Sequence, residues 1–445
     1  MTVEIEINPN SNTNSNPFCK DFDHIVFYVT SPKLVANYFV KLFGFKHYAY
    51  KGLETGSRDI SSTVIKNNNV IFVLTGVIRP LHKEPRNRLI DSIHHHIAVH
   101  GDGVKDVAFK SDNLDSIVDN LISKNSTHLL INKVNDLLSY SKITEVNDKF
   151  GTLKYITING INDTIHTIID RSNYKGFLPG YELIDDEFQL KPLIELGSID
   201  HCVQNQDWDQ MISTCQFYKD YFSFHKFWSV DENQVFTEYS ALHSTVMASE
   251  NEIVKMPVNE PAIGLKKSQI EEFIEFNNGP GIQHIAIKVD NIIDSIKKMK
   301  DSGVEFINVP DSYYENIEKK LKLEKHPKIK ESLKSIKKLG ILIDFDENGY
   351  LLQLFTKPIF ERPTFFFEII QRSNHNGFGA GNFKGLFEVL EKDQEMRGNL
   401  TDQDIEHKLE KHVIEETETP KKKIKPVIKE EITDDDIADA INYLA

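Results

Sequence analysis

The segment Gly281–Lys288, with the sequence GIQHIAIK, repeats the segment Gly103–Lys110, GVKDVAFK, 178 residues earlier in the chain. Both segments are short apolar runs bounded by glycine, which is typical of buried strands. Two further pairs of similar segments occur in the same order: Phe22–His24 (FDH) with Ile199–His201 (IDH), and Ile168–Asn173 (IIDRSN) with Ile369–Asn374 (IIQRSN). The order and the similar spacing indicate that the chain contains two copies of one structural unit.

The two copies differ in the residues that could bind a metal ion. Equivalent positions hold His24, Asp106 and Thr167 in the first copy and His201, His284 and Glu368 in the second. Two imidazoles and a carboxylate are the ligand set of non-haem ferrous oxygenases. A single histidine on an apolar strand is more often a packed core residue than a ligand, and these three residues share no local motif. If the halves fold alike, however, the second set converges in one pocket and the first is its vestige.

Length, charge and cysteine content limit what surrounds such a site. A chain of 445 residues exceeds the size of one growing core, so two domains with tails are expected. The net charge, 52 minus 67 or −15, argues against nucleic acid as a partner. The cysteines Cys19, Cys202 and Cys215 lack C-x-x-C spacing, which fits a reducing compartment and offers no thiolate metal site. We find no leader sequence and no apolar run near the roughly 20 residues of a membrane span. The expected location is the cytoplasm.

Apolar periodicity predicts the same order of elements in each half. In the first half we expect strands at 25–29, 44–50, 64–74, 104–109, 153–158 and 165–170, and helices at 32–42 and 114–123. In the second half we expect strands around 201 and at 227–230, 235–239, 244–248 and 282–288, and helices at 212–221 and 292–301. Each half therefore reads as two βαβββ units. This predicts an α+β fold of two tandem modules, each curling a mixed sheet around a cavity.

Composition suggests where the modules begin and end. We expect a disordered N-terminus at 1–20, an N-terminal module without metal at 21–175, a linker at 176–195 and a catalytic module at 196–400. The linker is predicted from its glycines, prolines and mixed charges. Residues 401–445 are rich in lysine, aspartate and glutamate, which predicts a charged and largely disordered tail.

Several longer segments resemble one enzyme family. They are Tyr50–Arg58 (YKGLETGSR), Trp228–Asp231 (WSVD), Thr237–Leu242 (TEYSAL), Met256–Pro261 (MPVNEP), Gly281–Ala286 (GIQHIA) and Gly377–Phe383 (GFGAGNF). With these segments the chain is similar to the 4-hydroxyphenylpyruvate dioxygenases, from about Phe22 to Asp402. The resemblance implies tandem vicinal-oxygen-chelate modules, built from the βαβββ units above, with Fe(II) only in the C-terminal one. It also implies a homodimer.

The resemblance assigns the site residue by residue. The iron ligands fall on His201, His284 and Glu368. The substrate-binding positions fall on Ser244, Pro257, Asn259, Gln269, Gln283, Gln353, Phe355, Phe366, Phe378, Asn382 and Phe383. The implied reaction joins 4-hydroxyphenylpyruvate and O2 to give homogentisate and CO2, by decarboxylation, ring hydroxylation and side-chain migration, in tyrosine and phenylalanine catabolism. No protein general base is assigned.

The residue types suit those positions. Phe355, Phe378 and Phe383 would hold an aromatic ring by packing, and amides such as Gln269 and Gln283 would orient oxygens of the substrate without adding charge. Without the resemblance, such amides are more often surface groups and such phenylalanines plain core. Residues 382–392 have the spacing of an amphipathic helix, which the family uses as a lid beside the iron.

Three other functions remain open from the residues. A hydroxymandelate synthase would oxidise the benzylic carbon of the same substrate, although Phe355 favours attack on the ring. A non-catalytic ligand-binding module would have lost a metal ligand, and all three are retained here. An extradiol dioxygenase would use a histidine base in the pocket. His243 is the nearest candidate, but strand alternation directs it away from Ser244.

The densest histidine cluster, His94 to His96 with His100, is interpreted as a surface loop without metal. Three successive side chains on an extended strand cannot face one ion, and no carboxylate pattern frames them.

Overall fold

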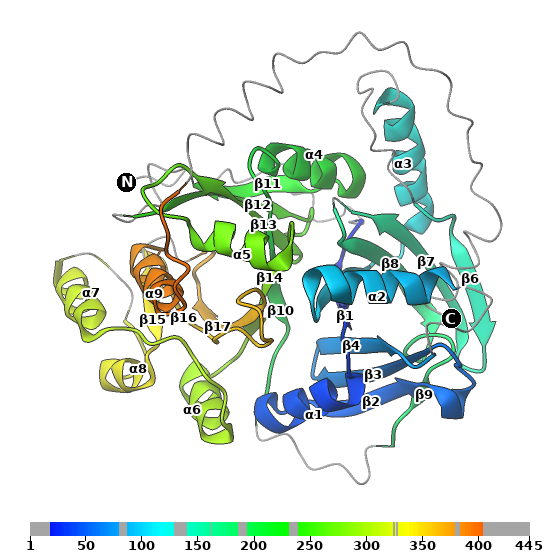
Figure 1. The fold of residues 1–445 in the computed structure, drawn as a ribbon, viewed down its shortest axis with the longest axis horizontal. Helices are drawn as coiled ribbons and strands as arrows, with labels where there is room; N and C mark the ends of the chain where they lie inside the picture. Colours follow the sequence, from blue (N-terminus) through cyan, green and yellow to red (C-terminus); the bar gives the residue numbers. More distant parts are fainter. Residues whose placement is uncertain are drawn as a thin grey trace.

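A computed structural model describes residues 18–79, 87–128, 140–160, 162–185, 194–230, 239–323, 325, 328–378 and 383–403, with the backbone alone at 124–128, 230 and 383–388. The chain forms two modules side by side, each built on one sheet (Figure 1).

The first module contains two βαβββ units joined by a helix. The first unit consists of β1 (Asp21–Tyr28), α1 (Pro32–Phe43), β2 (Lys46–Lys51), β3 (Ile60–Asn67) and β4 (Val70–Val77), with a short 3-10 turn at Leu53–Thr55. The second unit consists of β5 (Gly103–Lys110), α3 (Leu114–His128), β6 (Thr144–Asp148), β7 (Gly151–Asn159) and β8 (Ile165–Tyr174). Helix α2 (Arg88–His100) joins the units, and β9 (Glu182–Leu183) follows them.

The second module repeats this order. Its first unit consists of β10 (Ile199–Asn205), α4 (Met211–Phe222), β11 (His225–Val230), β12 (Ala241–Ala248) and β13 (Lys255–Ala262). Its second unit consists of β14 (Gly281–Lys288), α6 (Ile292–Ser302), β15 (Leu342–Phe345), β16 (Tyr350–Phe355) and β17 (Phe366–Ser373), with α7 (Asp311–Leu323) and α8 (Leu333–Leu339) inserted after α6. Helix α5 (Gln269–Asn277) joins the units, and α9 (Phe383–Met396) follows.

Strand pairing is the same in both modules. The strand orders are β6-β7-β8-β5-β1-β4-β3-β2-β9 and β11-β12-β13-β10-β14-β17-β16-β15. The two units of each module meet at one antiparallel pair, β1 with β5 and β10 with β14. The next pairs outward are parallel, so each sheet is mixed. The predicted fold class, tandem βαβββ modules, is confirmed.

Local sequence explains where several helices begin and end. Pro32 occupies the first turn of α1, and Gly44 ends that helix at φ 74, a conformation that favours glycine. Ser268 and Glu271 form a capping box that begins α5. Asn291 accepts a hydrogen bond from the backbone N–H of Asp294 and caps α6. These signals can be recognised in the sequence.

One apolar core is shared by the two modules. Helices α1, α4 and α6 contribute to it, and Phe355 and Phe366 extend it to the concave face of the second sheet. Phe72 of β4 stacks on Phe367 of β17 with ring centroids 5.7 Å apart and planes 8° apart. Phe39 and Phe43 of α1 contact the same Phe367 ring edge-on. Aromatic packing of this kind helps to bind the modules to each other.

Two local predictions are wrong. The expected strand 64–74 is in fact a hairpin of β3 and β4, because Asn68 adopts a left-handed φ of 51° and turns the chain. The histidines at 94–96 lie on helix α2 and not in a loop. Asn87 caps this helix, and Leu89, Ile90, Ile93 and His96 form its buried side. Most of the expected strand 235–239 lies outside the described residues.

The expected linker 176–195 also contains structure. Phe177, Leu178 and Tyr181 are buried in the inner core of the first module, and β9 pairs with β2. We propose that the first module extends to about residue 185 and that the second begins near 194. Most of the N-terminus 1–20 and of the tail 401–445 lies outside the described residues.

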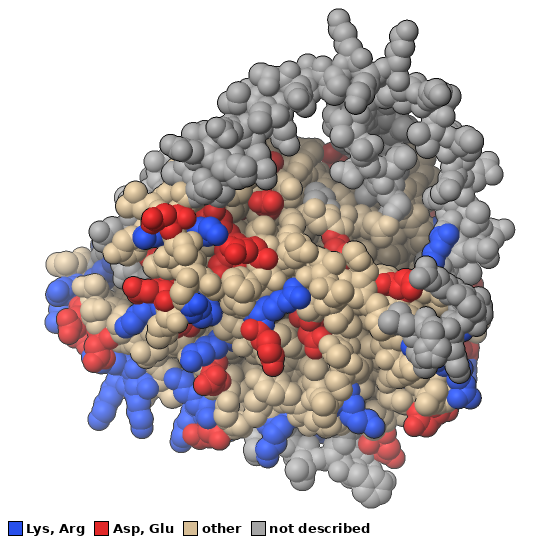
Figure 2. Space-filling view, viewed as in Figure 1, with Lys and Arg blue, Asp and Glu red and all other residues tan. Residues whose placement is uncertain are grey.

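Charged residues of both signs mix over the visible face of the molecule (Figure 2). Lysines gather where Figure 1 places α6, α7 and α8, each of which carries several. Among the described helices, none combines the length and the apolar character needed to cross a membrane.

Candidate metal centre

Strand register brings the three predicted ligands onto one face of the second sheet. In the pairing of β10 with β14, His201 lies opposite Ala286 and Val203 opposite His284. In the pairing of β14 with β17, Ala286 lies opposite Glu368. Residues directly opposite each other in a sheet point to the same face, as do residues two apart in one strand. All three side chains therefore face the concave side of the sheet.

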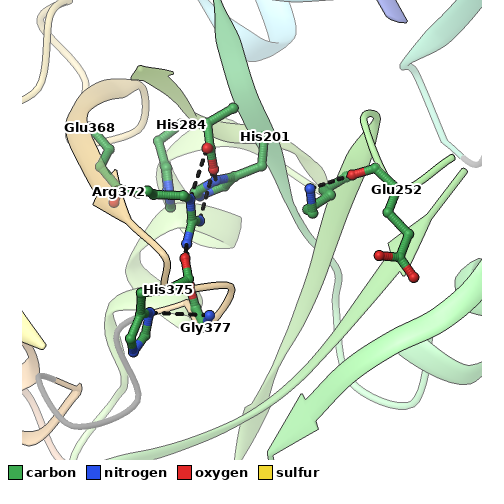
Figure 3. Close-up of polar contacts among 9 residues, drawn as sticks. His201, Glu252, His284, Glu368, Arg372, His375 and Gly377 are labelled. Carbon is green, nitrogen blue, oxygen red and sulfur yellow. Dashed lines mark hydrogen bonds and ion pairs between the residues drawn. The ribbon is translucent and has the colours of Figure 1, made fainter. Parts of the chain in front are cut away.

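The three side chains converge closely (Figure 3). Nε2 of His201 lies 3.2 Å from Oε2 of Glu368, and Nε2 of His284 lies 3.5 Å from the same oxygen. All three residues are buried. A carboxylate shared by two imidazole nitrogens in a buried site is expensive unless a proton or a metal ion lies between them.

A β-bulge before each histidine supplies the partner of its other ring nitrogen. The register of β10 against β14 shifts between Ile199 and His201, and again between Val203 and Gln204. The extra residues are Asp200 on one strand and Gln283 on the other. A bulge re-aims a side chain that would otherwise point to the opposite face. Nδ1 of His201 donates to Oδ2 of Asp200 at 2.8 Å, and Nδ1 of His284 donates to Oε1 of Gln283 at 3.0 Å.

His201, His284 and Glu368 shift one another's pKa values. Burial lowers the pKa of His201, but the charge of Glu368 and the hydrogen bonds to Asp200 and Glu368 outweigh it, and the net pKa is raised. Burial prevails for His284, whose pKa is lowered. Burial raises the pKa of Glu368, but the two imidazoles outweigh it and lower the pKa to about 2. Glu368 is therefore a carboxylate and His284 a neutral imidazole.

This arrangement fits a metal ion. His284 donates Nδ1–H to Gln283, so its Nε2 lone pair faces a carboxylate oxygen. A proton on Nε2 of His201 accounts for the contact between His201 and Glu368. It leaves the Nε2 lone pair of His284 facing a lone pair of the Glu368 carboxylate. A divalent metal bonded at about 2.1 Å to each ligand would place neighbouring donors about 3.0 to 3.4 Å apart, close to the distances found. The donor set, with both Nδ1–H groups fixed by neighbours, is typical of a ligating histidine pair.

Aromatic rings surround the ligands. Phe366 stacks on His284 with centroids 4.8 Å apart and planes 18° apart, and Phe355 meets the same imidazole edge-on at 6.0 Å. Phe378 meets His201 edge-on at 5.1 Å. A cavity opens beside this group, and Gln269, Gln283 and Phe366 are among its lining residues.

Four of the remaining predicted pocket residues lie on strands of the second sheet. Ser244 lies opposite Asn259 in the pairing of β12 with β13, Pro257 lies two residues before Asn259, and Gln353 lies two residues before Phe355. Register thus places these four on the face that carries the ligands. Gln283 donates to Oε1 of Gln269, which extends the contact from His284 to helix α5. Asn382 and the side chain of Phe383 lie outside the described residues.

His243, the candidate base of an extradiol dioxygenase, does not face the ligands. It alternates with Ser244 on β12, and its Nδ1 lies 3.1 Å from Oε1 of Glu260. Its position argues against a base in the pocket.

The equivalent residues of the first module lie at matching positions of its sheet. His24, Asp106 and Thr167 occupy the register positions of His201, His284 and Glu368, with the same two bulges, here at Asp23 and Lys105. Thr167 donates its backbone N–H and its hydroxyl to the carboxylate of Asp106, at 3.0 and 2.5 Å. Within the described chain, Nε2 of His24 is buried without a hydrogen-bond partner. Asp106 and Thr167 thus bind each other, whereas Nε2 of His24 makes no hydrogen bond to either residue.

A second group of possible ligands includes part of the histidine cluster. His96 and His100 lie one turn apart on α2, and both approach Oδ2 of Asp163, at 3.1 and 3.3 Å. The reason given above against metal here, an extended strand, is wrong because the segment is helical. The ammonium group of Lys105, 2.6 Å from Oδ1 of Asp163, opposes a cation at this position instead.

Sequence reasoning gave no role to Asp200 or Arg372. Arg372 holds the carboxylate of Asp200 through two hydrogen bonds, Nε to Oδ1 at 2.9 Å and Nη2 to Oδ2 at 2.8 Å. A signal was present in the repeat, because Asp23 and Arg171 retain the same two residue types in the first module, where two of the three candidate ligands differ.

Known proteins resemble this chain over most of its length. Residues 198–317 match the model of the Glyoxalase/Bleomycin resistance protein/Dioxygenase superfamily. A 4-hydroxyphenylpyruvate dioxygenase of Aspergillus fumigatus is 49% identical over 391 residues, which cover 86% of this chain and 94% of that protein. One of Danio rerio is 46% identical over 386 residues, covering 86% and 92%. A solved triple mutant of 4-hydroxymandelate synthase from Streptomyces coelicolor is 25% identical, with a TM-score of 0.69, and covers 84% of this chain and 99% of that one.

Proposed function

The chain belongs to the 4-hydroxyphenylpyruvate dioxygenase family, and on that premise we propose that it converts 4-hydroxyphenylpyruvate and O2 to homogentisate and CO2 at an Fe(II) site. The observation that carries the proposal is the convergence of His201, His284 and Glu368 on one buried point, with both Nδ1–H groups already engaged. A non-catalytic binding module would not need this complete ligand set.

His201, His284 and Glu368 would hold Fe(II), which would supply electrons for O2 activation and a binding point for the α-keto acid. The protein residues fix the geometry of that chemistry. Glu368 contributes one negative charge, so the ferrous site keeps a net positive charge that attracts the substrate carboxylate. Asp200 and Gln283 prevent the two imidazoles from rotating.

The aromatic walls would orient the substrate ring. Phe355 and Phe366 stand at about a right angle to each other, with an interplanar angle of 74°, and form a corner beside His284. Phe378 forms a wall beside His201. A ring held between such faces presents one carbon to the metal, which favours one regiochemical outcome. Gln269 and Gln283 reach the cavity from the side of α5 and would bind a polar oxygen of the substrate.

The remaining site proposals follow the family. Ser244, Asn259 and Gln353 share the ligand face of the sheet and would contact substrate oxygens directly or through water. Pro257 would shape the wall next to Asn259. Asn382 and Phe383 are proposed from the sequence resemblance alone.

Product analysis tests the function. The protein is loaded with Fe(II) without oxygen, then given 4-hydroxyphenylpyruvate and O2, and the product is identified by chromatography. Glu368→Ala is the inactive variant, and Thr167→Ala, at the equivalent position of the first module, is the matched control that stays active. Homogentisate from the wild type and the control supports the proposal. Hydroxymandelate would show the sister activity, and tight binding without turnover would show a binding module.

The cellular setting is also proposed. We propose a homodimer in the cytoplasm that takes part in tyrosine and phenylalanine catabolism. All three cysteines are free thiols, which supports a reducing compartment. Sedimentation of the purified chain tests the dimer, and fractionation of cells tests the location.

A further inference from the structure

We propose that Arg372 is a positioning residue that fixes the ligand His201 and the pocket wall Phe378 together. This inference rests on the proposed metal site, and it assigns a role to a residue that binds neither metal nor substrate. Arg372 lies next to His201 and Gly377 in the centre of the site (Figure 3).

One guanidinium group makes all the contacts. Its Nε and Nη2 atoms bind the two oxygens of Asp200, and Asp200 in turn holds Nδ1 of His201. Its Nη1 atom donates to the backbone carbonyl oxygens of His375, at 3.1 Å, and Gly377. Its planar face lies over the ring of Phe378, with Cζ 5.4 Å from the ring centroid. A planar group with five fixed donors can make these contacts at once, whereas an ammonium cannot.

Phe378 and His201 also touch each other, so the contacts close a loop. The Phe378 ring meets the His201 imidazole edge-on, with centroids 5.1 Å apart and planes 69° apart. Arg372 is nearly buried, and so is Asp200. Asp200 thus accepts hydrogen bonds from Arg372 on both of its oxygens and from Nδ1–H of His201.

The first module contains the same arrangement without the complete set of metal ligands. Arg171 binds both oxygens of Asp23, at 2.6 and 2.7 Å, and Nδ1 of His24 lies 2.6 Å from Oδ1 of Asp23. Arg171 also donates to the carbonyl of Phe177 and lies 5.4 Å from that ring. Phe177 meets His24 edge-on, with centroids 5.4 Å apart and planes 68° apart.

This duplication separates a structural role from a role in the metal site. Removing Arg171 or Arg372 costs similar contacts, because each buried carboxylate loses a two-point partner. Only the loss of Arg372 also frees a metal ligand and a pocket wall. The first module thus supplies a matched control for the second within the same molecule.

The test compares four variants of the full chain: Arg372→Lys, Asp200→Asn, Arg171→Lys and Asp23→Asn. The dissociation constant for Co(II), used as an air-stable probe, is measured by competition with a chelator, and the Tm of each metal-free variant is measured alongside. We expect all four substitutions to lower Tm. Only Arg372→Lys and Asp200→Asn should weaken Co(II) binding, by about 10- to 100-fold, as expected for a lost partner of a ligating histidine.

A second readout follows Phe378 without metal. Trp228 lies 5.7 Å from Phe378, so its fluorescence reports on the position of that ring. In a Trp208→Phe background, Arg372→Lys should shift the emission of Trp228, whereas Arg171→Lys should leave it unchanged. The Asp200→Asn variant covers the case in which Arg372→Lys does not fold, because it keeps the size of the side chain.

The outcomes separate this inference from the proposed function. If the wild type binds no Co(II), the metal site itself is wrong and this inference falls with it. If the wild type binds Co(II) and the variants of both modules bind it equally well, the proposed function survives and the role of Arg372 is overturned.

Discussion

His284 donates its Nδ1–H to Gln283, the residue directly before it in β14. Neighbouring residues of a regular strand point to opposite faces, so this contact exists only because a β-bulge inserts Gln283 into the ladder. His201 and Asp200 form the same kind of pair. Each proposed metal ligand is thus oriented by the residue that precedes it in sequence. One of the two partners is charged and the other is neutral.

The neutral partner can be removed without leaving a buried charge. We expect Gln283→Met to weaken metal binding by about 10-fold, at the lower end of such effects, because His284 loses the acceptor that fixes its ring. Chelator competition with Co(II) measures the change. Gln353→Met, a substitution of another buried glutamine on the ligand face, should leave the metal affinity unchanged. Equal affinities for the two variants would show that Gln283 does not orient His284.

Two adjacent phenylalanines on β17 should separate binding from stability. Phe366 stacks on His284 and lines the cavity, whereas Phe367 faces the core between the modules. Phe366→Leu should raise KM for 4-hydroxyphenylpyruvate by about 5-fold, since an aromatic contact is worth about 1 kcal/mol. Phe367→Leu should lower Tm and leave KM unchanged. Steady-state kinetics and thermal unfolding of both variants measure this, and a KM effect from Phe367→Leu alone would contradict it.

Metal binding should stabilise the folded protein. A metal ion at 100 times its dissociation constant adds about 2.7 kcal/mol to the free energy of unfolding. We expect Co(II) to raise the Tm of the wild type and a chelator to reverse the rise. Glu368→Gln should abolish the rise, while Thr167→Val, at the equivalent position in the first module, should keep it. A metal-dependent Tm in Glu368→Gln would place the metal elsewhere.

Acid should weaken the contact between the modules at His166. This buried imidazole donates Nδ1–H to the Val107 carbonyl, lies 3.1 Å from the hydroxyl of Tyr218 and stacks on Phe109. Burial lowers its pKa to about 4. Between that value and the ordinary value near 6.5, the unfolded chain binds a proton that the folded chain does not, so stability falls as the pH falls.

Across this window, His166 lowers the free energy of unfolding by about 3 kcal/mol, at 1.36 kcal/mol for each pKa unit. His166→Gln keeps two polar atoms but cannot titrate in this range. Denaturant unfolding at pH 7 and pH 4.5 should therefore show a smaller loss of stability in the variant than in the wild type. Equal losses would assign the acid sensitivity to other groups.

The repeat made the fold and the ligands predictable. His201, His284 and Glu368 could be aligned with His24, Asp106 and Thr167 because matching segments occur in the same order, and the observed registers agree with that alignment. The bulges were not predictable, since they depend on how two distant strands pair and not on local pattern. For that reason, sequence reasoning saw Gln283 only as a substrate-binding residue and overlooked Asp200.

Other errors had signals in the sequence that were missed. Three asparagines at 67–69 mark the turn between β3 and β4, but the apolar residues on both sides suggested one long strand. Helical spacing is visible around the histidines of α2, at Leu89, Ile90, Ile93 and Ile97. The segment was nevertheless interpreted from its histidines alone. The contact of Arg372 with Gly377 and Phe378 needed the structure, because it depends on the path of the chain after β17.

The stacking of Phe72 on Phe367 has a consequence for how this gene can change over generations. The first module covers an apolar face of the second, so removing it would expose Phe367 and its neighbours to water. Selection on the second module therefore also acts on the residues of the first that cover it. A change of size at Phe72 or Phe367 would need a compensating change in the other module.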